Sequence, residues 1–434
     1  MSEDFEPDFD VIVIGAGIAG CVTAYQLAQQ GHEVLLIERG EQPGSKNLSG
    51  GVLYCQVMDK VFPDFIHQAP VERVITQNRI QFMNAGSVFG IDYADQRLAS
   101  PANAVTVLRA KLDGWLAEQC EAAGVIVMPG VRVDSLLTTE IGRVVGVKAG
   151  DDELHCRVVV AADGVNSFIA RYAGMRPRPA ENQLAVGVKA VVKLDSDVIE
   201  DRFQCAPGEG VAYAIVGDCT QGVGGGGFLY TNTDSISIGV VLRLDSLTES
   251  GLTAYEIFDR YLEHPFVAPL IEGGEISEYG CHLVAEGGLD MVGEIAADGI
   301  VIVGEAAGLT LNTGLTVRGM DLAAGSAIAA AAAIDEAIKA GDTSKTGLAG
   351  YRTRLFESFA GQDMETYEKA PEFLETDRIY GEYGRLLADV LYGVFNHDLT
   401  PRRHLMKVAT DTLKQSDLKL TQLGRDGLKG VRAL

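Results

Sequence analysis

One turn near the start of the chain limits the folds open to it more than any other feature. The apolar run Val11–Ile14 leads into Gly-Ala-Gly-Ile-Ala-Gly, whose glycines are Gly15, Gly17 and Gly20, and a helical pattern follows. The first glycine permits a tight turn, the second lets a pyrophosphate approach the backbone, and the third lets helix and strand pack closely. The helix N-terminus adds positive potential. The spacing predicts a dinucleotide-binding βαβ unit.

A carboxylate at the end of the next strand indicates which dinucleotide is bound. Glu33–Ile37 has a strand pattern, and Glu38 follows it, 18 residues after Gly20. A carboxylate at this place accepts hydrogen bonds from the hydroxyls of the adenosine ribose. It would repel a phosphorylated ribose, so Glu38 favours FAD or NAD over NADP.

Two later segments favour FAD over NAD. Val158–Ser167 is a strand that runs into Asp163, and Ile300–Gly308 is a strand that runs into Glu305, which can accept a ribityl hydroxyl. After Gly319 a long Ala-rich helix directs its N-terminal dipole at whatever lies beyond it. The pyrimidine edge of a flavin suits that position, because it carries negative charge when the flavin is reduced.

Composition and charge exclude several classes of protein. Hydrophobic residues make up 47% of the chain and charged residues 22%, which is typical of a globular protein. The net charge of −24 argues against nucleic-acid binding. None of the seven cysteines forms a Cys-x-x-Cys pair, so we expect neither a structural zinc site nor a cysteine-ligated iron–sulfur cluster in this chain.

Terminal and apolar segments bear on the compartment. Met1–Asp10 carries five acidic residues and no basic region, so we expect no secretory signal, and the odd cysteine count fits a reducing cytoplasm. The longest uncharged helical stretch, Leu322–Ile334, is shorter than the roughly 20 residues that cross a bilayer. We therefore expect a chain that does not span the membrane.

Four motifs together resemble the FAD-dependent fold of the aromatic hydroxylase and geranylgeranyl reductase superfamily: GAGIAG with Glu38, Arg109-x-x-Leu-Asp-x-Trp-Leu, ADGVNS and GEAAG. Three further segments resemble the branch of this superfamily that contains FixC and the electron transfer flavoprotein–quinone oxidoreductases. They are Gly44–Tyr54, Gly224–Gly239 and Gly314–Ala323. The resemblance covers residues 9 to about 400.

The resemblance implies an FAD site and a set of residues around it. They are Gly15, Gly17, Gly20, Glu38, Arg39, Arg109, Val131, Asp163, Gly304, Glu305, Gly319 and Met320, with Lys46–Gly51, including Gly50 and Gly51, near the isoalloxazine. Glu305 departs from the family, which usually has Asp there. The chain also lacks any cysteine after Cys281, whereas the larger quinone oxidoreductases carry cluster cysteines in a C-terminal ferredoxin-like segment. A cluster would then come from a separate polypeptide, as in the FixC-type arrangement.

The expected fold is α/β, with a discontinuous FAD-binding Rossmann-like domain of the glutathione-reductase type over residues 1–75, 100–180 and 285–340. A β-sheet substrate or quinone domain is expected over 76–99 and 181–284, since Gln183–Leu244 is almost entirely strand and turn and predicts an antiparallel sheet. A helical region with a basic tail is expected over 341–434. The glycine run Gly222–Gly227 either lines the flavin or quinone cleft or forms a hairpin turn.

The C-terminal part combines an apolar, aromatic helix with a basic tail. Arg378–Phe395 has few charges, and residues 401–434 hold eight basic and three acidic residues, a net charge of +5, so the first 400 residues sum to −29. A basic end on an acidic body suits an anionic membrane surface or an acidic partner. A packed core helix followed by a solvated tail is equally consistent with this pattern.

Electron transfer is the function that the resemblance implies. FAD would take electrons from an electron transfer flavoprotein, directly or through a small ferredoxin-like partner, and pass them to a membrane quinone from the cytoplasmic, inner face of the membrane. A prenyl double-bond reductase or hydroxylase is the first alternative. A non-catalytic subunit that holds FAD for an assembly is the second.

Overall fold

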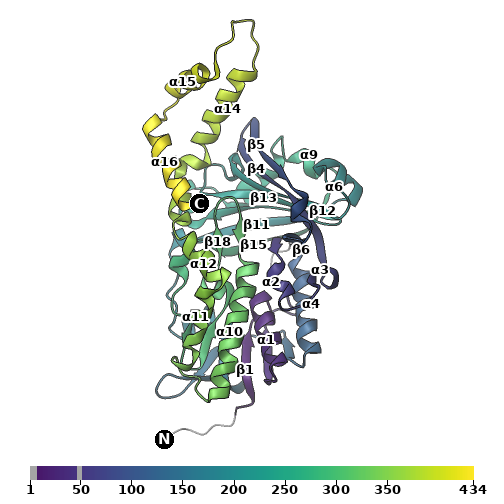
Figure 1. The fold of residues 1–434 in the computed structure, drawn as a ribbon, viewed down its shortest axis with the longest axis vertical. Coiled ribbons are helices and arrows are strands. Elements are labelled where there is room, and N and C mark those ends of the chain that lie inside the picture. Colours follow the sequence, from purple (N-terminus) through teal and green to yellow (C-terminus); the bar gives the residue numbers. More distant parts are fainter. Residues whose placement is uncertain (1–6, 46–50) are drawn as a thin grey trace.

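Two sheets and a projecting group of helices make up the molecule. The computed structural model describes residues 7–45 and 51–434. Figure 1 shows one sheet near the N-terminus, around strand β1 (Phe9–Ile14), and a larger sheet above it. Helices α14 (Glu382–Phe395) and α15 (Leu405–Gln415) project from the end of the molecule opposite the N-terminus.

The first sheet is the predicted dinucleotide-binding sheet. Its main path runs in the order β16-β17-β10-β1-β2-β7, and all its pairs from β17 to β7 are parallel. The other strands of this path are β2 (Val34–Glu38), β7 (Ile126–Pro129), β10 (Asp152–Ala161), β16 (Ala296–Ala297) and β17 (Ile300–Ile302). The central residues of β1, β2, β10 and β17 are buried, which explains why these strands are continuous apolar runs rather than alternating ones. The edge strand β7 is more open, and its Ile126 is exposed.

Helices cover this sheet. Helix α1 (Ile18–Gln29) packs between α10 (Met320–Ala340) and α4 (Arg109–Ala122), and α10 packs in turn against α11 (Gly350–Glu357). The buried face of α10 is mostly alanine, including Ala324, Ala327 and Ala331. Small side chains let neighbouring backbones approach, so this long apolar helix is a core element and not a membrane span. Helix α12 (Phe359–Thr366) follows α11.

A small antiparallel meander with turns at Gly142 and Gly150 extends from the start of β10. Strands β8 (Ser135–Thr138) and β9 (Val144–Ala149) pair antiparallel with each other, and β9 pairs antiparallel with β10. Both glycines have positive φ angles, of 85° and 63°, which a turn of this kind requires.

The larger sheet has nine strands and a mixed pairing pattern. Its order is β15-β11-β14-β13-β12-β4-β6-β3, with β5 on β4. The strands are β3 (Gly51–Tyr54), β4 (Val71–Asn84), β5 (Ser87–Ala94), β6 (Ala104–Val107), β11 (Leu184–Lys193), β12 (Glu209–Gly217), β13 (Gly225–Thr231), β14 (Ser235–Arg243) and β15 (Glu275–Ala285).

Two features of this sheet differ from the sequence-based expectation. The sheet is not purely antiparallel, because β12 pairs in parallel with β4, a strand from a distant part of the chain. It also includes Gly51–Tyr54, the start of β4 and Ala104–Val107, which lie within segments expected to form the FAD-binding domain. Short buried runs such as Ala-Val-Thr-Val carry no signal for which of two sheets they join, so the pattern could not separate them.

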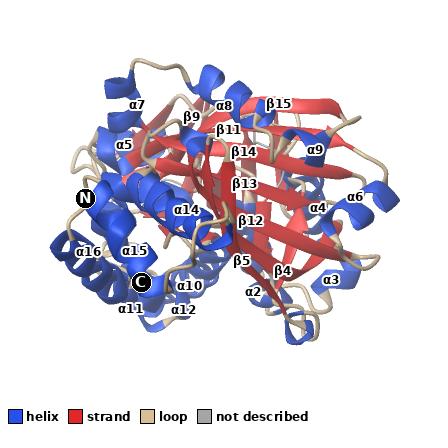
Figure 2. Cartoon of the chain, turned by 90° about the horizontal axis from the view of Figure 1, so that it is seen from above, coloured by secondary structure: helices blue, strands red, loops and turns tan. Residues whose placement is uncertain are grey.

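Short helices pack on the larger sheet and at its ends (Figure 2). Residues of α6 (Ser196–Phe203) and α8 (Ala254–Glu263), among them Phe203, Phe258 and Tyr261, form one hydrophobic cluster with β11 to β14. The remaining short helices are α2 (Gln56–Asp59), α3 (Phe65–Gln68), α5 (Phe168–Tyr172), α7 (Leu244–Ser250) and α9 (Ala268–Ile271).

The C-terminal region is helical, as expected. Besides α14 and α15 it contains α13 (Ala370–Leu374) and α16 (Leu420–Ala433), which pack against each other. The predicted helix Arg378–Phe395 is broken: a single helical turn over Asp377–Tyr380 ends at Gly381, and α14 begins after it. Within the described part of the chain, no helix is both long and apolar enough to cross a membrane.

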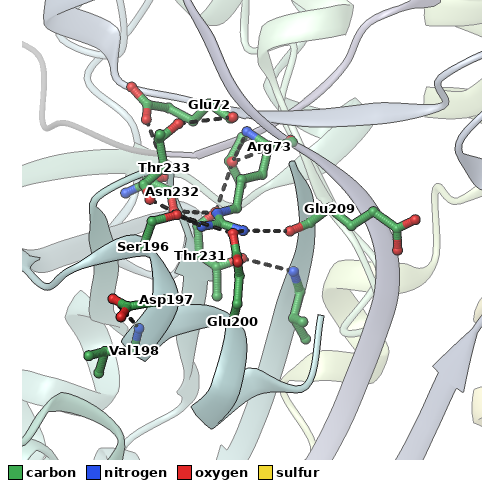
Figure 3. A network of polar contacts seen from close by, with 12 residues as sticks. Glu72, Arg73, Ser196, Asp197, Val198, Glu200, Glu209, Thr231, Asn232 and Thr233 are labelled. Carbon is green, nitrogen blue, oxygen red and sulfur yellow. Dashed lines mark hydrogen bonds and ion pairs between the residues drawn. The ribbon is translucent and has the colours of Figure 1, made fainter. Parts of the chain in front are cut away.

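One buried arginine on β4 forms hydrogen bonds to β12, to the turn between β13 and β14, and to α6 (Figure 3). Arg73, on β4, is 2% exposed. Its guanidinium donates to the carbonyl oxygens of Asn232 (2.6 Å), Glu209 (3.1 Å) and Thr233 (3.1 Å). It also donates to the Ser196 hydroxyl at 2.7 Å and to the Glu200 carboxylate at 3.1 Å on α6. These five bonds use all five N–H groups of the buried guanidinium, so none of its donors lacks a partner.

We expect Arg73→Met to destabilise the protein by about 3–5 kcal/mol, because it leaves one carboxylate and three carbonyl groups without their donor. Chemical denaturation of the holoprotein measures this free energy. Arg97→Met is the matched control, since the Arg97 side chain is 86% exposed and pairs with Asp95 at the surface. Its effect should stay below about 0.5 kcal/mol. Equal effects of the two substitutions would contradict the role given to the Arg73 network.

Candidate functional site

The glycine turn has the geometry that a dinucleotide requires. Gly15 has a φ of +104°, and a Cβ there would lie 2.4 Å from the Ala162 carbonyl oxygen. A Cβ on Gly20 would lie 1.8 Å from the Gly15 carbonyl oxygen, so this residue packs α1 onto the turn. Gly17 precedes α1, and the Arg109 guanidinium lies 3.4 Å from its ideal Cβ position. A cation therefore stands beside the backbone amides that begin the helix.

Glu38 closes the turn from the second strand. Its Oε2 accepts a hydrogen bond from the Ala16 amide at 2.9 Å, and its Oε1 accepts one from the Gly40 amide at 2.6 Å. A carboxylate offers about four acceptor sites, so two remain for ribose hydroxyls. The Val131 amide donates to the Glu38 carbonyl oxygen at 3.0 Å, which places the end of β7 beside the same strand end.

Two acidic side chains face the next part of the site. Asp163 accepts from the Ile169 amide through Oδ2 at 3.0 Å, and its buried Oδ1 has no partner among the described residues. Glu305 accepts from the Ala285 amide through Oε1 at 3.2 Å. Burial raises the pKa of both carboxyls. A ligand with hydroxyl groups would satisfy such acceptors.

The loop before α10 is held in place by an ion-pair network. Arg318, on β19 (Val317–Arg318), donates to Asp321 at 2.6 Å and to Asp363 on α12 at 2.5 Å. This fixes Gly319 and Met320 at the N-terminus of α10. Gly304 has a φ of +63°, and a Cβ there would lie 2.7 Å from the Ala19 side chain, so it lets the strand end pack against α1.

A single cavity of about 1760 Å³ brings most of the predicted site residues together. The predicted residues that line it are Gly15, Gly17, Glu38, Arg39, Gly51, Arg109, Val131, Asp163, Glu305, Gly319 and Met320. Gly20 and Gly304 do not line the cavity and act through packing. Lys46 and Gly50 lie outside the described residues.

The cavity continues into an apolar arm between the larger sheet and the C-terminal helices. The sheet contributes Ile80, Phe82, Tyr213, Phe228 and Tyr230, and the C-terminal region contributes Ile379, Tyr380, Tyr383, Leu386 and Leu387. Gly225–Gly227, the second half of the glycine run, also line it from within β13, whereas Gly222–Gly224 belong to the connection between the antiparallel strands β12 and β13. Each of the two predictions for the run thus holds for one half of it. Aromatic and aliphatic walls of this kind suit a flat ring with an apolar substituent.

Sequence patterns did not reveal several residues of this cavity. Tyr54, Arg243, Glu286 and Asn312 line it, although they come from strands and loops of ordinary composition. The Glu286 carboxylate accepts from the Asn312 amide at 3.0 Å. The pair Gly287–Gly288 after Glu286 is a local signal that another group approaches the backbone closely there, but the same pair is also typical of an ordinary turn.

These residues fit FAD. The glycine turn and Arg109 suit the pyrophosphate, Glu38 the adenosine ribose, and the partnerless Asp163 oxygen and Glu305 the polar linker. Gly319 and Met320, at the start of α10, suit the ring. When bound, the flavin supplies the two-electron redox chemistry, whereas the protein holds it, orients it and excludes water.

We expect Glu38→Ala to weaken FAD binding by about 1.5–3 kcal/mol, or roughly 10- to 150-fold in Kd, because hydrogen bonds to a charged acceptor are lost. Quenching of FAD fluorescence on titration with apoprotein measures the Kd. Glu41→Ala is the control, since Glu41 is exposed in the loop just beyond β2. FAD binding unchanged in Glu38→Ala, at matched stability of the fold, would remove Glu38 from the site.

Comparisons with known families agree with this assignment. Residues 8–215 match an FAD binding domain family. Residues 182–284 match the family described as ETF-QO, ubiquinone-binding, and residues 370–434 match the ETF-QO/FixC family C-terminal domain. FAD is therefore the cofactor of this chain.

Solved structures share the fold. A geranylgeranyl bacteriochlorophyll reductase-like protein from Thermoplasma acidophilum superposes with a TM-score of 0.68 at 20% identity, covering 96% of this chain and 98% of its own. The flavin-dependent brominase Bmp2 gives a TM-score of 0.62 at 16% identity, covering 98% of both chains. At these identities the likeness is one of fold alone.

Full-length relatives are much more similar in sequence. The probable electron transfer flavoprotein-quinone oxidoreductase YdiS of Escherichia coli K12 is 43% identical over 100% of both chains. Protein FixC of Escherichia coli O157:H7 is 42% identical, again over 100% of both. The chain therefore belongs to the FixC and electron transfer flavoprotein–quinone oxidoreductase family of FAD-dependent oxidoreductases.

Proposed function

We propose that this oxidoreductase takes electrons from an electron transfer flavoprotein and passes them through FAD to a membrane quinone. The names of the full-length relatives and the match of residues 182–284 to a ubiquinone-binding family support both partners. A separate ferredoxin-like protein would supply any iron–sulfur cluster. In the described residues, no group of three or more His, Cys, Asp or Glu side chains could hold a metal ion.

The volume and the lining of the cavity are the observations that support this proposal most directly. Ligand pockets typically enclose about 300–1,000 Å³, and this cavity of about 1760 Å³ has room for a second ligand besides FAD. Besides the residues that suit FAD, its lining includes the apolar side chains of the larger sheet and those of Tyr380 and Leu386 from the C-terminal region. A quinone has the matching chemistry, since it is a flat polar ring on an apolar tail.

The projecting helices support entry of the quinone from a membrane surface. The sequence left open whether Arg378–Phe395 faces a membrane or packs as a core helix. Its apolar residues near the start line the cavity, so the segment does not face a membrane over its whole length. Tyr392 and Phe395, farther along α14, are 69% and 75% exposed. Leu399, in the loop that follows, is fully exposed. Arg402, Arg403 and Lys407 come next and add positive charge.

Anaerobic electron transfer tests the proposed reaction. We expect a reduced electron transfer flavoprotein to bleach the FAD absorbance of the holoprotein, with or without the ferredoxin-like partner, and a water-soluble quinone to restore it. Bleaching by NADH or NADPH instead would favour the prenyl reductase or hydroxylase. An absorbance that no donor changes in any combination would favour a non-catalytic subunit.

We expect the holoprotein to sediment with anionic liposomes at low salt and less at high salt, because each basic residue near such a surface contributes about 1 kcal/mol. Replacing Tyr392, Phe395 and Leu399 together by Ser should reduce sedimentation, since these side chains would enter the headgroup region. Truncation after Thr400 is a poorer test, because α16 forms part of the cavity wall through Leu423 and Asp426.

Ile141→Ser is the matched control for this experiment. Ile141 is 90% exposed in the turn between β8 and β9, away from the helical projection. It should leave sedimentation unchanged. If the triple variant and the control bind liposomes equally well, the tip of α14 is not the membrane contact.

A further inference from the structure

Glu286 stands out among the cavity residues that the proposed electron transfer does not yet use. It follows β15, and its own amide donates to the Gln183 carbonyl oxygen at 2.9 Å, which fixes its backbone. Its Oε2 accepts from the Asn312 side chain at 3.0 Å. Its Oε1 is buried, and no residue in the described part of the chain offers it a hydrogen bond. One oxygen of this cavity-lining carboxylate therefore has no hydrogen-bond partner among the described residues.

The position of Glu286 joins the two ends of the cavity. The preceding residue, Ala285, donates to Glu305 at the cofactor end. Asn312, the partner of Glu286, accepts through Oδ1 from the Gly314 amide at 2.8 Å, in the loop that leads to Gly319. On the other side lie Arg243 and Tyr380, which line the apolar arm. Glu286 therefore lies between residues of the predicted cofactor site and residues of the apolar lining.

Burial and three neighbouring groups set the pKa of Glu286. Burial raises its pKa to about 7, although the Asn312 hydrogen bond and the Arg243 charge lower it, and the Glu305 charge raises it further. Arg243 is itself held by Asp245 at 3.0 Å, so its charge is shared. Tyr380 faces the same region with a pKa raised by burial, which keeps it neutral. Glu286 therefore takes up a proton more readily than an exposed glutamate does.

We propose that Glu286 is the proton carrier of this cavity: its carboxyl binds a proton when two electrons arrive and gives that proton up when they leave. The proposal deepens the proposed function and rests on it for the identity of the electron acceptor. The physical reason is Coulombic, because negative charge added to a cavity of low polarity favours protonation of a nearby carboxylate.

The step balances with a quinone as acceptor. Two electrons and one proton leave the reduced, singly protonated cofactor, and the O–H bond of the Glu286 carboxyl breaks to release the second proton. The two quinone carbonyl oxygens each form one O–H bond, and the quinone becomes a quinol. Oxidised cofactor and Glu286 carboxylate remain. The next two electrons come from the electron transfer flavoprotein, and solvent supplies one proton to each group.

The midpoint potential of bound FAD as a function of pH tests this proposal without any partner or quinone. For a two-electron couple, a tenfold change in an equilibrium constant corresponds to about 30 mV, so each additional proton taken up adds about 30 mV per pH unit to the slope. Between pH 7 and 8, wild-type protein should show a slope steeper than that of Glu286→Gln by up to that amount. Glutamine can still accept from Asn312, so the fold should be kept.

A matched control and a second variant complete the experiment. Glu72→Gln removes a buried carboxylate outside the cavity that Lys111 holds ionised, and its slope should equal that of the wild type. Asn312→Ala removes a hydrogen bond that lowers the Glu286 pKa, so its steeper region should begin at a higher pH than in the wild type. This second variant keeps the test valid if Glu286→Gln does not retain FAD.

The outcomes separate this proposal from the proposed function. Equal slopes of midpoint potential against pH in wild type and Glu286→Gln overturn the role of Glu286, whatever the partner experiments show. The role is also overturned if the steeper region begins at the same pH in Asn312→Ala as in the wild type. Different slopes, together with failure of any electron transfer flavoprotein to reduce the chain, overturn the proposed function and leave redox-linked protonation of Glu286 standing.

Discussion

The close approach of backbones at Gly15 and Gly20 is the constraint on which the rest of the structure depends. Gly20 lets α1 lie directly on the turn after β1, and Gly15 lets the same turn pack on the segment after β10. Gly304 extends this contact to the strand end before the Glu305 turn. A methyl group at any of the three would push the strand ends apart. Because Glu38, Asp163 and Glu305 all follow strand ends at this edge, the same contacts position the three acids around one cavity.

Sequence patterns predicted this half of the molecule well, and the reason is local. Glycine spacing, apolar strands and an acid at a strand end are all determined within a few residues, so Gly15, Glu38 and Glu305 could be predicted as cofactor residues, and they line one cavity. Pairing between distant segments has no such local signal. The parallel contact of β4 with β12 joins residues more than a hundred positions apart, and the pairings of β3 with β6 and of β6 with β4 each cross some tens of residues. Glu286 and Asn312 escaped notice for the same reason, since their roles arise only when two loops meet.

Charge is distributed in an uneven way that matches the division of the chain. The body is strongly acidic, yet the carboxyls of the cavity are desolvated and the pKa values of Asp163, Glu286 and Glu305 are raised. Arg109 and Arg318 are each paired with acids at the cavity wall. Of the basic residues of the tail, Arg402, Arg403 and Lys407 follow the exposed apolar tip, whereas Arg425 and Lys429 lie on α16, where they pair with Asp426 and Glu372. Burial and ion pairs therefore moderate the charge of the cavity wall within a strongly acidic body.

The pairing of β10 with β17 also governs how the chain can be assembled during synthesis. Val159 lies beside Ile300, and the Arg73 guanidinium bonds to carbonyl groups at positions 209, 232 and 233. Ribosomes release the N-terminal strands first, and those strands have one edge or one face uncovered until the later segments emerge. Neither sheet can close before roughly two-thirds of the polypeptide has left the tunnel. The nascent chain thus exposes apolar strands and unpaired strand edges for most of its translation.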